Sequence, residues 1–547
     1  MSSQSWYNTE RVAQKGSVVL AKWHAERAEK RAREQGQAGQ RAYAGAAYNR
    51  LTGDWTALNT SADSEIVTAL RALRARSREL VRDNAFAKNA IRIIQNNVVG
   101  VGIRLQAQVS NARGKLVDSI NDQIEREWEK WCQGDQCHAG GKLDFNEVLR
   151  MAIGRVAEDG EFPTRLVAQT FGESRVPLGL EVFESDRIID QWQTAQAPNG
   201  NAIRMGVEQN EWGRPTAYWL YPYHPGDYQF RNFVASKFIR VPAAEMLHIY
   251  IVDRWPQSRG VPWLHAIIRR LNDMRGYGDA EIVAARAGAN IVGFIRTPEL
   301  PAGEPNPQAS PEFASVPGTF RRLLPGEDFV GFNPSRPNAA FEAFMRFMLR
   351  EIAAGIGCSY EGLSRDYSQS NYSSSRLAAL EDRILWRILQ GWLICKYMLP
   401  IYYRWLDAAV LSGVLNIPDY YSNRDKYRAV RMRPPGWSWI DPTKEVAAYK
   451  QAVRSGFMTV GDVIGQTGGG ADAEDIFKAR RAELDMMSDL NLVFDTDPGQ
   501  TDDKGKEQGT PTAEAGDGNE SSSDPVPAEG SADNSENSAG ADGQTEE

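Results

Sequence analysis

Cysteine is scarce in this chain of 547 residues. The four cysteines, Cys132, Cys137, Cys358 and Cys395, are too few to form a disulfide framework, so a reducing cytoplasm is the expected compartment of synthesis. The first residues lack the basic-then-apolar order of a signal peptide, and no uncharged apolar run reaches membrane-spanning length. We therefore expect a protein without membrane association, built from several packed units.

Recognisable catalytic motifs are also missing. GDQCHAGGK has the wrong spacing for a phosphate-binding loop, and VVGVGI lacks the third glycine of a dinucleotide-binding fingerprint. Cys132, Cys137 and His138 cluster within seven residues, but no second ligand pair accompanies them. The five histidines are scattered. The sequence thus predicts no enzyme, no cofactor and no bound metal.

One group of acidic residues leaves an enzymatic alternative open. Glu158, Asp159 and Glu161 lie close together, and Asp186 and Asp190 follow later. Paired carboxylates can hold the metal ions of a nuclease. The rival interpretation is a turn around Gly160 that leads into the strand FPTRLVAQ, and no lysine or histidine motif supports the nuclease.

Negative charge is concentrated at the C-terminal end. From Asp495 onward, fifteen Asp and Glu oppose two lysines, a local net charge of −13, and no aromatic residue occurs. Since the whole chain carries −8, the preceding 494 residues carry about +5. A mildly basic folded part permits contacts with phosphate without requiring them, and the tail is predicted to be disordered.

Hydrophobic periodicity predicts helices and short strands of an α+β protein. Leu264, Ile267, Leu271 and Met274 form a one-sided stripe, which predicts a helix over about 264–290. A second helix is expected over 341–357 and a long apolar one from about Ser375 to Leu415. Strands are expected in IRLQAQV, FPTRLVAQ, GLEVFE and MLHIYIVD, and a hairpin in RMGVEQNEWGRPTAYWLYP.

Four stretches, in this order along the chain, resemble the lambda-type family of phage portal proteins. They are RARSRELVRDNAFAKNAIRIIQNNVVGVGI, GVEQNEWGRPTAYWLY, RGVPWLHAIIRRLNDMRGYGDAEIVAARAGAN and SYEGLSRDYSQSNYSSSR. The resemblance covers about Ser61 to Gly456. It implies a portal fold with a mixed α/β wing, a two-helix stem, a small clip that contains β-strands, and a helical crown.

The resemblance also implies a division of the chain into parts. They are a basic N-terminal arm at 1–60, the wing at 61–260, the first stem helix at 261–290, the clip at 291–340, the second stem helix at 341–357, a channel loop at 358–375, the long wing helix and crown at 376–490, and the disordered acidic tail at 491–547.

Site residues follow from this division. The residues expected to line a DNA channel are Arg365, Ser368, Gln369, Ser370, Asn371, Ser373 and Arg376. The expected polar face of the stem consists of Arg269, Arg270 and Arg275, and the expected partner surface of the clip of Arg321, Arg322, Glu327 and Asp328. Hydroxyls and amides make weak, exchangeable contacts with phosphate, which suits a channel through which DNA of any sequence slides.

A homo-oligomeric ring, typically a dodecamer, at one capsid vertex is the function that the resemblance implies. The expected partners are double-stranded DNA without sequence specificity, the terminase, the major capsid or scaffold protein and the head–tail connector protein. The ring would be assembled in the cytoplasm of the bacterial host and remain in the virion. Besides the nuclease, a minor capsid or scaffold-like structural protein without a channel stays open as an alternative.

Overall fold

The computed structural model describes residues 59–494, except for gaps at 228, 230–237, 291–292, 297–327, 332–339, 438–441 and 468–472, together with Thr501. Two compact units divide the chain, Met1–Ala473 and Glu474–Glu547. The predicted arm and acidic tail therefore lie almost wholly outside the described residues, as does most of the predicted clip.

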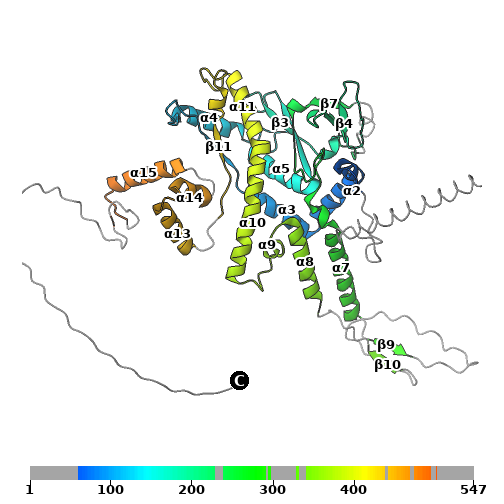
Figure 1. The fold of residues 1–547 in the computed structure, drawn as a ribbon. Coiled ribbons are helices and arrows are strands. Elements are labelled where there is room, and N and C mark those ends of the chain that lie inside the picture. Colours follow the sequence, from blue (N-terminus) through cyan, green and yellow to red (C-terminus); the bar gives the residue numbers. More distant parts are fainter. Residues whose placement is uncertain are drawn as a thin grey trace, which may run out of the picture. The chain divides into compact units, whose positions relative to one another are not determined.

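Helices are the most abundant elements in the described part of the first unit (Figure 1). They are α2 (Ala62–Asp83), α3 (Ala85–Val98), α4 (Asp118–Trp131), α5 (Phe145–Asp159), α7 (Ile268–Asn290), α8 (Phe341–Ile356), α9 (Tyr360–Ser364), α10 (Tyr372–Leu393), α11 (Leu399–Leu411), α12 (Arg424–Tyr427), α13 (Pro442–Arg454) and α14 (Val460–Thr467). Helix α15 (Ala473–Asp489) accounts for most of what is described of the second unit.

The described strands pair antiparallel in four small sheets. Their orders are β1 (Arg104–Ala107) with β11 (Val430–Arg433); β3 (Gly179–Val182), β2 (Glu161–Val167) and β8 (Met246–Tyr250); β4 (Ala202–Arg204), β5 (Val207–Gln209), β6 (Pro215–Leu220) and β7 (Ile239–Pro242); and β9 (Gly293–Arg296) with β10 (Asp328–Gly331). The combination of helices and small antiparallel sheets confirms the predicted α+β class.

Local sequence signals account for several element boundaries. The Asn84 side chain accepts hydrogen bonds from the backbone N–H groups of Phe86 and Ala87, so it separates α2 from α3. Asp144 and Glu147 form a capping box at the start of α5. That helix ends at Gly160, whose φ of +93° is favourable for glycine and whose Cβ, if it had one, would lie 2.5 Å from the Val261 carbonyl carbon.

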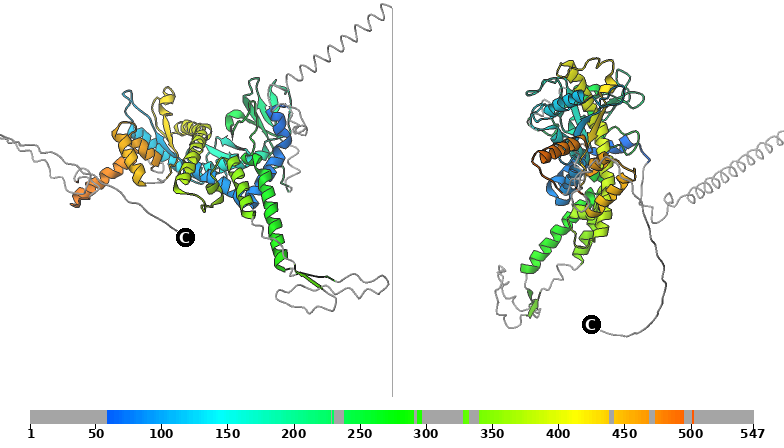
Figure 2. Two further views of the ribbon diagram at one scale, coloured as in Figure 1. Left: turned by 60° about the horizontal axis from the view of Figure 1, so that its bottom comes forward. Right: turned by 90° about the vertical axis from the view of Figure 1, so that its left-hand side faces the viewer.

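Helices α7 and α8 lie side by side (Figures 1 and 2). The predicted stripe is confirmed, because Leu264, Ile267, Leu271 and Met274 are all buried. The regular helix begins only at Ile268, however, since Trp263–Ala266 forms a 3₁₀ turn behind Pro262. The predicted helix over 341–357 corresponds to α8.

The long helix predicted from about Ser375 to Leu415 is continuous, but it contains a π-helical turn, Ile394–Met398, between α10 and α11. In this turn the Leu399 N–H donates to the Ile394 carbonyl, five residues earlier. Pro400 explains the wide turn, because it has no N–H for the carbonyl four residues before it and its ring would collide with that carbonyl in an α-helix.

The main hydrophobic core lies between α3, α5 and this long helix, and aromatic rings fill one end of it. Trp128 of α4 meets Trp405 edge-on, with 5.1 Å between ring centroids, and Tyr402 at 5.7 Å. Both partners lie on α11 and are fully buried. Within the described ranges no helix has the length and apolar character needed to cross a membrane.

Truncating a core ring tests this arrangement. Trp405→Ala is expected to lower the free energy of unfolding by about 3–5 kcal/mol, because it removes a buried ring and leaves a cavity beside Trp128. Leu411→Ala, at a side chain that is 76% exposed on the same helix, should change it by less than ~0.5 kcal/mol. Urea denaturation measures both, and equal effects would contradict the proposed core.

Candidate functional site

The polar segment between α8 and α10 is more ordered than a single loop. Helix α8 ends at Gly357, which has a φ of +81°. Ser359 then caps α9 by accepting a hydrogen bond from the Gly362 N–H, and its hydroxyl donates to Asp382 of α10 at 2.7 Å. Asn89 of α3 donates to the carbonyls at the end of α9. The sequence thus folds here into a short helix fixed to two longer ones.

Asp366 organises the turn after α9. One carboxylate oxygen accepts a hydrogen bond from the Tyr360 hydroxyl at 2.7 Å, and the other accepts from the Ser368 hydroxyl at 2.6 Å and from the Ser368 N–H at 3.0 Å. These hydrogen bonds, most of all the one from the Ser368 hydroxyl and then the one from Tyr360, lower the pKa of Asp366 to about 2. The turn is therefore held by a charged carboxylate at neutral pH.

The start of α10 differs from the prediction. Asn371 and Ser374 form a capping box, in which the Asn371 side chain accepts from the Ser374 N–H at 2.8 Å. Since this cap satisfies the free N–H groups of the first turn, α10 begins at Tyr372 rather than near Ser375. The predicted channel loop at 358–375 therefore contains α9 and the first residues of α10.

Most of the predicted channel residues are exposed. Arg365, Ser368, Gln369, Asn371 and Ser373 are exposed, while Ser370 and Arg376 are partly buried. Arg365 makes no ion pair within the described ranges, and Arg376 lies 3.9 Å from Glu445. Tyr367 and Tyr372, each 55% exposed, lie in the same segment and were not among the predicted site residues. The alternation of tyrosine with small polar residues in the sequence was the signal that could have identified these two tyrosines as part of the segment's surface.

The predicted polar face of the stem is partly neutralised within the chain. Arg270 pairs with Glu351 of α8 at 2.9 Å, and Arg275 pairs with Glu79 of α2 at 3.1 Å. Arg269 keeps 91% of its side chain exposed. In the structure, these three arginines therefore have different surroundings and are not equally available as one polar face.

Of the predicted partner surface of the clip, the structure describes only Asp328. Arg321, Arg322 and Glu327 lie outside the described residues. Asp328 is the first residue of β10 and pairs in register with Arg296 of β9.

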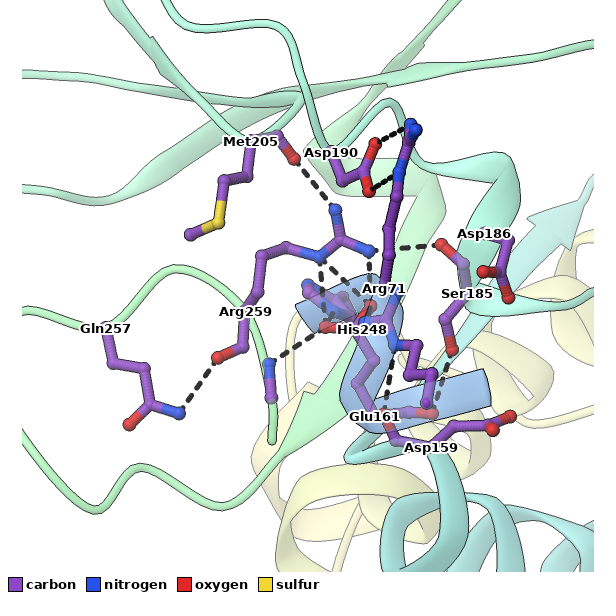
Figure 3. Close-up of polar contacts among 12 residues, drawn as sticks. Arg71, Asp159, Glu161, Ser185, Asp186, Asp190, Met205, His248, Gln257 and Arg259 are labelled. Carbon is purple, nitrogen blue, oxygen red and sulfur yellow. Dashed lines mark hydrogen bonds and ion pairs between the residues drawn. The ribbon is translucent and has the colours of Figure 1, made fainter. Parts of the chain in front are cut away.

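Asp159 and Glu161 of the acidic group lie in a buried ionic network (Figure 3). Glu161 is fully buried, and its carboxylate accepts hydrogen bonds from Arg74 at 2.6 Å, from the Arg259 Nε at 3.0 Å and from the Gly260 N–H at 2.9 Å. His248 Nε2 lies 3.0 Å from the same carboxylate. Burial alone would raise the pKa of Glu161, but the guanidinium groups of Arg259 and Arg74 hold it well below its usual value.

The other carboxylates of this region are also paired with arginines. Asp159 accepts a hydrogen bond from the Arg78 Nε at 2.6 Å, and Glu158 lies 3.1 Å from Arg155. Arg78 also binds Asp186, and Arg71 binds Asp190. These carboxylates serve ion pairs and present no set of free ligands. Across the described ranges there is no group of three or more His, Cys, Asp or Glu side chains placed to hold a metal ion.

The cysteine cluster has an equally structural arrangement. The Cys137 thiol is buried and lies near the carbonyls of Cys132 and Leu143, at 3.6 and 3.8 Å. Burial raises the pKa of Cys137 to about 12, so the thiol is protonated at neutral pH. His138 Nδ1 accepts a hydrogen bond from the Lys142 N–H at 3.2 Å.

Comparison with known proteins settles the family. Residues 48–390 match the family described as phage portal protein, lambda family. The chain belongs to this family. A probable portal protein of Halomonas phage phiHAP-1 is 29% identical over 453 residues, which cover 81% of this chain and 86% of the relative. Portal protein B of Escherichia phage lambda is 21% identical over 448 residues, covering 74% and 82%.

Two solved structures are also similar to this portal family member. The neck of a native gene transfer agent particle with C12 symmetry has 16% identity and a TM-score of 0.39, over 73% of this chain and 99% of the other. An HK97 family phage portal protein from Corynebacterium diphtheriae has 11% identity and a TM-score of 0.30, over 66% and 94%. Portal proteins are structural proteins, so the prediction that the chain is not an enzyme is confirmed.

The buried network gives a stability prediction. Glu161→Gln is expected to lower the free energy of unfolding by about 3–5 kcal/mol, because Arg74 and Arg259 would remain buried without their counter-ion. Asp190→Asn removes an ion pair with the half-exposed Arg71 and should cost less than ~1 kcal/mol. Urea denaturation compares the two variants, and a Glu161 variant as stable as the Asp190 variant would refute the structural role.

The turn at Asp366 gives a pH prediction. The pKa of Asp366 is lowered in the folded state. Its stabilising contribution to the turn is therefore present at neutral pH and is lost as the pH falls toward about 2. Asp366→Asn should remove it at pH 7. We expect the backbone amides of 364–371 to exchange hydrogen several-fold faster in this variant, as measured by mass spectrometry. Asp122→Asn, on the exposed side of α4, should leave them unchanged.

Proposed function

We propose that this chain forms a homo-oligomeric ring, dodecameric in the capsid, at a single capsid vertex of a phage. Double-stranded DNA would enter and leave through its axial channel. Membership of the lambda portal family over 48–390 supports this proposal, as do the names of the relatives in phages lambda and phiHAP-1. The ring would be assembled in the cytoplasm of the bacterial host and remain in the virion.

The observation that carries the channel role is the surface of the segment from Arg365 to Arg376. Its exposed side chains are hydroxyls, amides and tyrosine rings, with Arg365 as the one exposed cation among them. Each lysine or arginine that binds phosphate adds affinity that resists sliding, whereas hydroxyls and amides exchange readily with water. The segment can therefore border moving DNA without retaining it.

Other parts of the chain would take the remaining portal roles. Helices α7 and α8 would be the stem, and the segment 291–340, which includes β9 and β10, the clip. The clip would receive the terminase during packaging and the head–tail connector protein afterwards. The parts before α7 would be the wing and face the major capsid or scaffold protein, and the parts after α10 would lead into the crown.

Ring formation is the first test. Negative-stain electron microscopy of the purified chain should show rings with a central hole, and mass photometry should give one predominant oligomer. Monomers at every concentration would contradict the proposal. Closed shells or co-assembly with capsid protein without a channel would favour a minor capsid protein instead.

A charge substitution tests the channel role. Gln369→Lys combined with Ser373→Lys should leave ring assembly intact but slow DNA translocation in a terminase-driven packaging assay, because each copy then offers two more phosphate-binding cations. The defect should weaken as the salt concentration rises. Gln451→Lys, at an exposed position on α13, is the matched control. Packaging at the normal rate by the double variant would exclude this segment from the channel wall.

A further inference from the structure

Helix α10 carries an exposed stripe of large aliphatic side chains. Leu377, Leu380, Ile384 and Ile388 are 60%, 44%, 60% and 62% exposed. Their spacing of three and four residues places them along one face of the helix, while Trp386 and Leu389 face the core. Soluble proteins rarely expose such a continuous apolar stripe, and a 3–4 spacing is typical of a seam that packs against another helix.

The stripe, Leu377–Ile388, has charged borders of opposite sign. On a helical projection Arg376, Arg383 and Arg387 lie along one border, and Glu381 lies along the other. Arg383 and Arg387 are held over the ring of Trp437, with 5.7 and 5.6 Å to its centroid. One side of the stripe is therefore an ordered basic edge.

Helix α7 has an exposed face of complementary shape and charge. Gly276 and Ala280 are exposed, and Val283, one helical turn further on, is 62% exposed. A Cβ added at Gly276 would meet no atom within 4 Å, so the space in front of this face is open. Asp273 and Asp279 lie beside these small residues and are exposed. The face is thus shallow and has two carboxylates at its borders, while the exposed Arg269 on the same side of the helix lies 3.9 Å from Asp273.

Other sides of both helices are used in contacts within the chain. Helix α7 contacts α2 and α8, and α10 contacts α3. A closed ring of identical subunits requires two different surfaces on each copy, because one surface of a subunit must meet the other surface of its neighbour. The aliphatic stripe of α10 and the small-residue face of α7 are two such surfaces. The stripe is bulky and has a basic edge, whereas the face of α7 is shallow and has carboxylates at its borders.

We propose that the stripe Leu377–Ile388 of one copy packs on the small-residue face of α7, Gly276–Val283, of a neighbouring copy. This inference rests on the ring of the proposed function and names the residues that would join its subunits. Arg376, Arg383 and Arg387 would then lie opposite Asp273 and Asp279. Ser373 precedes the stripe on the same face of α10. The contact therefore also places the polar segment Arg365–Arg376 of each copy at a boundary between two copies.

Two variants, each with one damaged surface, test the pairing. Ile384→Asp combined with Ile388→Asp puts charges into the stripe, and Ala280→Glu fills the shallow face of α7. Because all three positions are exposed, both variants should fold and keep the far-UV circular dichroism spectrum of the wild type. Each alone is expected to be monomeric by size-exclusion chromatography with light scattering. Mixed in equal amounts, they should form a one-to-one dimer and no ring, since each retains one intact surface.

Several outcomes would overturn the pairing. Rings formed by either variant alone would do so, and so would a mixture that stays monomeric. Leu411→Asp, at an exposed apolar position of α11 outside both surfaces, is the control and should assemble like the wild type. If the unmutated chain never forms rings, the proposed function fails. If it does form rings but the stripe variant forms them too, only the pairing fails.

A measurement on the unmutated chain complements these variants. Cys395 is exposed and continues the face of the stripe two turns beyond Ile388, whereas Cys137 and Cys358 are buried. Maleimide should therefore label Cys395 much more slowly in assembled rings than in subunits separated by dilution. Equal rates in both forms would count against the stripe as the contact between copies.

Discussion

A single buried carboxylate determines how the first unit is assembled. Glu161 opens β2, and the groups around it come from α2, from β8 and from the residues just before α7. Removing a charge from water is costly unless counter-charges and hydrogen bonds compensate it, so these distant segments must come together correctly or the network is not formed. Because α7 starts a few residues after Arg259, the position of this helix depends on the same carboxylate.

Elements marked by local signals could be predicted from the sequence. The stripe from Leu264 to Met274 depends on neighbours within one or two turns, and it is found in the structure. The role of Glu161 could not be predicted, because its partners Arg74 and Arg259 are 87 and 98 residues away. Without knowledge of these partners, the sequence left a nuclease-like metal site open as an alternative interpretation of the acidic cluster.

The candidate site was partly predictable for the same reason. Its polar composition is a property of the sequence alone, and most of the selected side chains are indeed exposed. Its conformation depends on tertiary contacts, since α9 is too short to be stable alone and is held by Asn89 and Asp382. The sequence therefore indicated what the segment presents to its surroundings, but not the short helix and caps that give it shape.

The π turn sets the angular phase of the long helix. Trp386 and Trp405 both face the core although nineteen residues separate them, whereas five full α-helical turns take about eighteen. The one surplus residue, accommodated in Ile394–Met398, corrects the phase by about 100°. Without this correction, the outward stripe of α10 and the inward rings of α11 could not both keep their directions. A deletion of one residue therefore preserves the directions of both surfaces only when the residue is removed from that turn.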